Sequence, residues 1–236
     1  RIKNQGGGTS HKTKIDTAQP RIVENRQGLA ISFQILGGYV GDQPAGKSLL
    51  LDFGDIESGT SKMGRWSMVT SLAGKFVEFN ASFTHADSLG GAVTSLIKEV
   101  RTHTLVQDVR VDLAGRDKVR DFLAKDGDVY RVYESDGADT EVQNQTASAQ
   151  MTVQGNNASL RFSPVAQGFA YARVPDPARG AKLPVQVTRS DGYIVPAENV
   201  WLSKERNEDL SWSYFLNIFD ANTSGQYSIG FVAGAA

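Results

Sequence analysis

The chain has 236 residues, of which 40% are hydrophobic and 22% are charged, and its formal net charge is −1. This composition is that of a globular protein with room for one large domain or two of ordinary size, and it excludes an intrinsically disordered chain. The near-zero net charge gives no field to attract nucleic acid, no apolar run is long enough to span a bilayer, and the absence of cysteine excludes disulfides and thiolate metal sites. We therefore expect no nucleic-acid partner and no membrane span.

Residues 1–20 contain three consecutive glycines, scattered lysines and few apolar side chains. Such a segment cannot bury enough apolar surface to order itself, so we expect a flexible N-terminal arm. Because the chain starts at Arg1, we also expect a processed product or part of a longer protein. The arm is then either a strand that adds to a neighbouring subunit or a linker to an upstream domain.

Residues 21–106 hold short apolar runs separated by turn-forming residues, which predicts a first β-sandwich domain. The clearest strand is 75–83, where apolar residues alternate from Val77 through Phe79 to Phe83 and share one face of a half-buried strand. The other strands predicted in this domain are 29–35, 48–53, 65–71 and 94–106.

The stretch 115–141 contains six aspartates and two glutamates and looks more like a chemical site than any other part of the sequence. Carboxylates in glycine-containing turns are natural calcium ligands, but the spacing is not that of an EF-hand and basic residues nearly cancel the charge. We therefore favour a solvated connector over 107–140 that needs no cofactor, with the one helix-like segment of the chain at 118–126. The alternatives are catalytic carboxylates or a calcium site, whose candidate ligands are Asp126, Asp128, Asp136 and Asp139.

Residues 141–236 repeat the strand pattern and predict a second β-sandwich domain. Tyr227, Ile229 and Phe231 alternate with small or polar neighbours, so the last strand is expected to close a sheet. The expected fold is therefore all-β, with two antiparallel, Ig-like β-sandwich domains joined by a short connector that carries both acidic and basic residues. The strands predicted in the second domain are 151–154, 159–163, 168–174, 183–189, 213–219 and 226–232.

Residues 41–48, GDQPAGKS, match the spacing of a phosphate-binding loop. Such a loop needs a buried parallel strand before it and a helix after it, whereas this segment contains Pro44 and leads into an apolar strand, so we interpret the match as chance. The sequence also has no nucleophile elbow and no zinc-protease motif. We predict no catalytic residue and do not expect an enzyme.

Three aromatic residues near polar neighbours are the candidate ligand-binding residues: Trp201, Trp212 and Tyr214. Exposed aromatic rings can stack on sugars, which would make these residues a glycan-binding platform. The competing interpretation is packing in the core or at a sheet edge.

Several phrases occur in a fixed order between residues 28 and 232: GRWSMVTSLAGKFVEFNASFTHADSLGG, SLIKEVRTHTLVQDV, GRDKVRDFLAKD, YESDG, FAYARVPDPARG, VTRSDG, NVWLSKER and FDANTSGQYSIGF. In this order they resemble an uncharacterised module of large bacterial secreted and surface repeat proteins with CARDB-like, Ig-type β-sandwich domains. The resemblance implies an extracellular or cell-surface location and a scaffold or interaction role, and it supplies no catalytic residue. The long Asp-Pro-Asp connector of those proteins is shortened here, so no metal site carries over from it.

We accordingly expect an extracellular structural or adhesive module of a larger bacterial secreted or surface protein. Its partners would be other protein subunits or surface proteins, including further copies of itself in a self-assembling homo-oligomer. The alternative is a carbohydrate-binding module with a glycan as ligand, and a hydrolase is less well supported.

Overall fold

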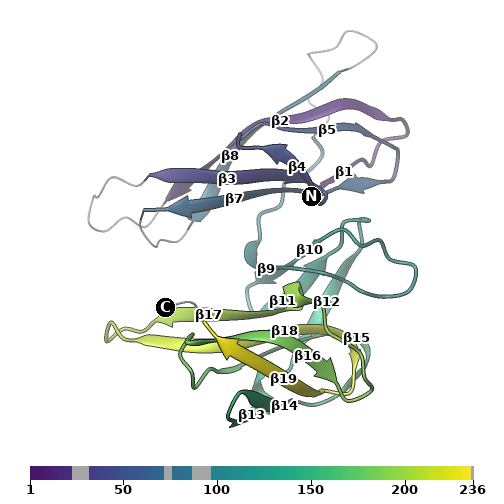
Figure 1. Ribbon diagram of the computed structural model, residues 1–236. Helices are drawn as coiled ribbons and strands as arrows, with labels where there is room; N and C mark the ends of the chain where they lie inside the picture. Colours follow the sequence, from purple (N-terminus) through teal and green to yellow (C-terminus); the bar gives the residue numbers. More distant parts are fainter. Residues whose placement is uncertain (23–31, 72–75, 87–96, 235–236) are drawn as a thin grey trace. The chain divides into compact units, whose positions relative to one another are not determined.

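The computed structural model describes residues 1–22, 32–71, 76–86 and 97–234, with the backbone alone described for 17–22 and 76–86. Strands dominate throughout this part of the chain, in several antiparallel sheets (Figure 1). The prediction of an all-β fold is confirmed.

The chain divides into two compact units. Unit 1 comprises Arg1–Arg101 and Ser135–Gly137, and unit 2 comprises Thr102–Glu134 and Ala138–Ala236. The boundary between Arg101 and Thr102 therefore lies before the predicted connector, and all of that connector except Ser135–Gly137 belongs to unit 2.

Two three-stranded antiparallel sheets, in the orders β5-β2-β8 and β4-β3-β7, make up most of unit 1, together with the short pair β1-β6. Its core is the cluster Ile15, Leu51, Phe53 and Ile56, onto which Trp66 packs. The strands of unit 1 are β1 (Ile2–Lys3), β2 (Ser10–Ile22), β3 (Phe33–Val40), β4 (Gln43–Gly46), β5 (Leu51–Ile56), β6 (Ser61–Lys62), β7 (Gly64–Thr70) and β8 (Phe76–Ala86).

The predicted flexible arm over 1–20 is corrected by the structure, because β2 is the central strand of its sheet. Ile15 pairs with Leu51 on one side and with Phe83 on the other, and its side chain is buried. A central strand makes backbone hydrogen bonds on both edges, so few apolar side chains suffice to hold it. The amino-acid composition of residues 1–20 does not reveal these backbone hydrogen bonds, which is why it predicts a flexible arm.

The predicted strand 75–83 corresponds to β8, although the side chains of Phe79 and its alternating neighbours lie outside the described residues. Residues 29–31 and 94–96 of two other predicted strands also lie outside the described part of the chain. The described remainder of those strands begins at Phe33 in β3 and at Thr104 in β9.

A seven-stranded sheet, in the order β17-β18-β15-β12-β11-β10-β9, and a four-stranded sheet, in the order β13-β14-β19-β16, make up unit 2. Neighbouring strands are antiparallel except β12 and β15, which run parallel. The strands are β9 (Thr104–Val109), β10 (Asp121–Asp126), β11 (Val129–Tyr133), β12 (Asp139–Asn144), β13 (Gln150–Gln154), β14 (Asn157–Arg161), β15 (Val165–Pro175), β16 (Lys182–Arg189), β17 (Val200–Arg206), β18 (Trp212–Thr223) and β19 (Gln226–Ala233).

Both faces of the seven-stranded sheet are buried at its centre, as β15 shows most clearly. Ala170 and Ala172 belong to a core that also contains Leu160 and Ile229 of the four-stranded sheet. Phe169 and Tyr171, on the opposite face, belong to a second core with residues of β9 to β12. Small side chains on one face and large rings on the other explain why β15 is apolar almost without interruption.

The predicted connector over 107–140 is wrong, because β10, β11 and parts of β9 and β12 occupy this stretch. Leu123, Val132 and Val142 are fully or nearly fully buried in the second core, so alternate positions point inward while many of the charges face solvent. The helix-like segment 118–126 is corrected as well, because β10 pairs with both β9 and β11. The buried residues alternate along these strands, but the many charged residues between them hide this alternation in the sequence.

Truncating Leu216 to alanine should lower the free energy of unfolding by about 2–5 kcal/mol, because this residue is 1% exposed in the core between the two sheets of unit 2. Leu183→Ala in β16 is the matched control: Leu183 is 45% exposed, so its change should stay within about 0.5 kcal/mol. Urea unfolding of the two variants provides the comparison. Equal losses would contradict the described packing of β18.

Candidate functional site

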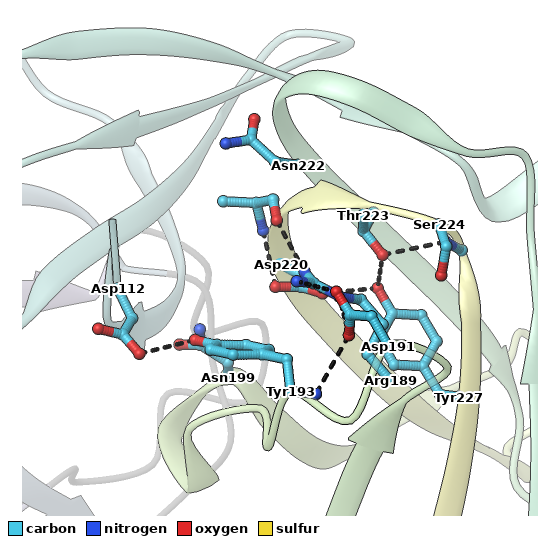
Figure 2. Close-up of polar contacts among 12 residues, drawn as sticks. Asp112, Arg189, Asp191, Tyr193, Asn199, Asp220, Asn222, Thr223, Ser224 and Tyr227 are labelled. Atoms are coloured by element: carbon cyan, nitrogen blue, oxygen red, sulfur yellow. Dashed lines mark hydrogen bonds and ion pairs between the residues drawn. The ribbon is translucent and has the colours of Figure 1, made fainter. Parts of the chain in front are cut away.

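A network of polar side chains lies where β16, β18 and β19 approach one another in unit 2 (Figure 2). Arg189, the last residue of β16, donates from Nη1 to Asp220 Oδ2 at 3.1 Å and to the carbonyl oxygen of Ala221 at 3.0 Å. Its Nε and Nη2 donate to Asp191 Oδ2 at 3.0 and 2.8 Å. One guanidinium therefore binds both a turn carboxylate and a strand carboxylate.

Asp220 is the buried acid of this network, with 4% of its surface exposed. Besides the bond from Arg189, its Oδ2 accepts a hydrogen bond of 2.8 Å from the Tyr227 hydroxyl at the start of β19. The Tyr227 hydroxyl also bonds the hydroxyl of Thr223, the last residue of β18. The carboxylate is thus satisfied by groups from two other strands, as a buried charge requires.

The turn between β18 and β19 holds Thr223 and Tyr227 in register. The backbone N–H of Gly225 donates to Thr223 Oγ1 at 3.0 Å. Gly225 has φ of +70°, and a Cβ there would lie 2.2 Å from the carbonyl oxygen of Phe162. Only glycine fits this turn without a shift of the backbone.

Tyr193 extends the network to the loop after β9. Its hydroxyl donates to Asp112 Oδ2 at 2.8 Å, and the Arg189 guanidinium lies 4.6 Å from the centre of its ring. Asn199 fixes the same loop, since its side chain accepts from the N–H of Arg110 at 2.7 Å and donates to the Arg110 carbonyl oxygen at 2.9 Å. The network therefore joins three strand ends and the loop that carries Asp112.

The protonation states follow from these contacts. Burial raises the pKa of the Tyr227 phenol, and the neighbouring Asp220 carboxylate raises it further. The hydrogen bond from Arg189 lowers the pKa of Asp191, and the same bond is the main cause of a raised pKa at Arg189. At neutral pH the Tyr227 phenol is therefore neutral, whereas Arg189 and Asp191 are charged and form an ion pair.

The segments RSDGYI (189–194) and DANTSGQY (220–227) are rich in turn-forming residues, and the sequence alone predicts no site in either. The structure places Arg189, Asp191 and Tyr193 in the first, and Asp220, Thr223 and Tyr227 in the second. The signal that could have revealed the network is Asp220, an acid directly after the apolar run of β18. A charge within a strand buried on both faces needs a partner from another element.

The predicted glycan platform is only partly brought together. Trp201 is partly buried against the second core, with its ring stacked on Tyr171 at 6.0 Å between centroids, so it is a packing residue. Trp212 and Tyr214 are two residues apart in β18, lie on one face of the sheet, and are partly exposed. The segment that holds Trp201 is strand β17, for which the sequence analysis predicted no strand.

The four candidate calcium ligands are spread over two hairpins. Asp126 bonds His103 at 2.7 Å and accepts from the Tyr133 hydroxyl at 2.8 Å. Asp139 accepts from Arg131 Nε at 2.7 Å, Asp128 is exposed in the turn after β10, and Asp136 lies in the turn after β11. Within the described residues no group of three or more histidines or acids is placed to hold a metal ion. The phosphate-loop match at 41–48 lies in the β3–β4 hairpin and the segment before β5, which is not the setting of a phosphate loop.

Replacing Tyr227 with phenylalanine should lower the free energy of unfolding by about 1–3 kcal/mol, because it removes a buried donor to Asp220. Tyr193→Phe is the control, since its hydroxyl bonds Asp112 at an exposed position and its loss should cost less than about 1 kcal/mol. Thermal and urea unfolding measure both. A larger effect at Tyr193 would contradict the central place of Asp220.

Asp126 should make the stability of unit 2 depend on pH. Burial acts to raise its pKa, but the hydrogen bonds from His103 and Tyr133 outweigh burial and hold the pKa below its usual value of 3.8. A group with a lowered folded-state pKa contributes stability above the unfolded pKa and loses it as the pH falls through the folded one. The gap in unfolding free energy between the natural protein and Asp126→Asn should therefore be full at pH 7 and close below pH 3.8. Asp128→Asn, at the exposed turn, is the control; a gap for Asp126→Asn that does not narrow as the pH falls would contradict the assignment.

The chain matches no family model, no curated protein and no solved structure. In the described ranges, none of the helices has the length and apolar character needed to cross a membrane.

Proposed function

We propose that this chain is an extracellular structural or adhesive module of a larger secreted or surface protein. It consists of Ig-like sandwich units, has no catalytic activity and needs no cofactor. The observation that carries the proposal is the network around Asp220, in which the reactive groups of the site are bonded to one another. The Arg189 guanidinium and the Tyr227 hydroxyl both bond the buried Asp220 carboxylate. We call these three residues the clamp, because they hold strands together rather than act as a catalytic centre.

The position of this clamp suits a module that works outside the cell. β18 belongs to the seven-stranded sheet, while β16 and β19 belong to the four-stranded sheet, so the bonds among Arg189, Asp220 and Tyr227 connect the two layers of unit 2. Many extracellular sandwiches connect their layers with a disulfide, which a chain without cysteine cannot form. The buried ion pair between Arg189 and Asp220 supplies a non-covalent connection between the two layers.

The partners in this proposal are other protein subunits or surface proteins, with further copies of the chain among them. Each sheet of unit 2 has two edge strands, which pair with a neighbouring strand on one side only. They are β9 and β17 in the seven-stranded sheet and β13 and β16 in the four-stranded sheet. Sheet edges and faces are the surfaces through which such modules bind neighbours.

A carbohydrate-binding module is the second candidate, favoured by one observation. Trp212 and Tyr214 share one face of β18 and remain partly exposed, so both aromatic side chains are accessible to a glycan. Trp201 no longer belongs to this set, since it packs against the second core.

Location is the property that separates the proposal from an intracellular role. Antibodies raised against the purified chain should label intact cells of the source organism as strongly as permeabilised ones. Antibodies against a cytoplasmic protein of the same cells are the control and should label only after permeabilisation. If the chain itself is labelled only after permeabilisation, the proposal is wrong.

A further inference from the structure

One end of the β17–β18 hairpin carries a group of cationic and aromatic side chains that the clamp does not use. In β18, Trp212 and Tyr214 lie on the same face; in β17, Arg206 stands opposite Trp212 and Lys204 opposite Tyr214. Cross-strand partners share a face of the sheet, so the four side chains form one surface. With Arg179, from the loop after β15, they make up what we call the basic aromatic patch.

The rings of the patch hold its cations in place. Lys204 Nζ lies 4.7 Å and Arg206 Cζ 5.6 Å from the centre of a Trp212 ring, and Arg179 Cζ lies 5.4 Å from the centre of the Tyr214 ring. Cation–π contacts at these distances favour particular rotamers of long side chains that would otherwise be mobile. The charges are therefore partly ordered before any ligand arrives, which reduces the entropy lost on binding.

The loop that presents Arg179 is built for this position. Asp176 is buried and its carboxylate accepts from the backbone N–H of Ala178 at 2.9 Å and of Gly180 at 2.7 Å. Its own N–H donates to the carbonyl oxygen of Tyr214, which ties the loop to β18. Arg179 has φ of +51°, a conformation that is costly for a residue with a side chain and that occurs where the surrounding structure imposes it.

The patch has an excess of positive charge. Among the described residues, no acid lies within ion-pair distance of Arg179, Lys204 or Arg206. The neighbouring acid Glu205 alternates to the opposite face, where it pairs with Arg173. Glu208 and Asp209 lie in the turn of the hairpin, and Asp209 accepts hydrogen bonds from the N–H and hydroxyl of Ser211.

We propose that the basic aromatic patch binds an anionic polysaccharide whose sugar units carry carboxylates, that is, a polyuronate. This deepens the proposed adhesive function and rests on it. Three unpaired cations on one face complement a chain with a negative charge on successive sugars, and the planar guanidinium of an arginine accommodates a planar carboxylate through two parallel hydrogen bonds. The ligand meets side chains on the face of the sheet and leaves the edge of β17 free.

The same geometry disfavours other ligands. Single-stranded nucleic acid and neutral sugars need a free ring face for stacking, and here cationic side chains lie over both rings. An acidic peptide carries its carboxylates on flexible side chains, which lose more conformational entropy on binding than carboxylates attached directly to the rings of a polyuronate. Charge complementarity with a polyuronate uses every member of the patch.

Calorimetric titration of the full chain with a galacturonic acid decamer tests the proposal, with the methyl-esterified decamer as the uncharged ligand of the same backbone. The acid should bind and the ester should not, and binding should weaken as sodium chloride is raised. Lys204→Gln/Arg206→Gln should weaken binding by about tenfold, since each exposed charge contact contributes up to about fivefold. Arg161→Gln, an exposed arginine on β14, is the matched control and should leave the dissociation constant unchanged.

Trp212→Ala separates an organised patch from a simple cluster of charge. It keeps every cation but removes the ring beneath Lys204 and Arg206, so binding should weaken by at least about threefold with the net charge unchanged. Circular dichroism of each variant verifies the fold, and Arg206→Gln alone serves if the double variant is unstable.

The proposal is overturned if the decamer does not bind, if the double variant binds as well as the natural protein, or if Arg161→Gln weakens binding equally. It is also overturned if heparin, an acidic peptide or single-stranded DNA of matched charge binds more tightly than the decamer. These results leave the surface location untouched. Labelling of permeabilised cells alone would refute the proposed function whichever ligand binds.

Discussion

The neutralisation of one buried carboxylate organises unit 2. Asp220 lies in β18 with 4% exposure, and an ionised acid at such a position costs several kcal/mol unless charges and hydrogen bonds compensate it. Compensation comes from Arg189 at the end of β16 and from Tyr227 at the start of β19, both in the other sheet. The ion pair with Arg189 and the hydrogen bond from Tyr227 therefore fix where the two sheets of unit 2 lie relative to each other. The turn that contains Gly225 holds Thr223 and Tyr227 in the positions that these bonds require.

The second constraint is that the centre of the seven-stranded sheet is covered on both faces. Along β15, alanines face the four-stranded sheet and aromatic rings face the second core. Along β18, Leu216 and Ile218 face the first core and Phe219 the second. Toward the start of β18, the face of Leu216 and Ile218 continues into the basic aromatic patch. There cationic side chains, rather than the four-stranded sheet, lie over Tyr214 and Trp212. The position where apolar cover ends is thus the position where an interaction surface begins.

Where apolar alternation is plain, the sequence predicts the strand. Tyr227, Ile229 and Phe231 alternate with small or polar residues, and β19 lies at their positions. Prediction fails where a strand is held by backbone pairing or by a few isolated buried residues. The central strand β2 has little apolar content. In β10 and β11, the buried Leu123 and Val132 are surrounded by charged residues. The clamp itself is beyond sequence reasoning because its members come from separate turns. Only Asp220, a charge following an apolar strand, indicates that a partner must exist.

Arg189 and Asp220 act as one unit across the two sheets of unit 2. A double-mutant cycle of unfolding free energies, with Arg189→Met, Asp220→Asn and the double variant, measures their coupling directly. Each single change should be strongly destabilising, the double variant should cost far less than the sum of the two, and the coupling energy should reach about 2 kcal/mol or more. Losses that add to within about 0.5 kcal/mol would show that the two residues act independently and would contradict the clamp.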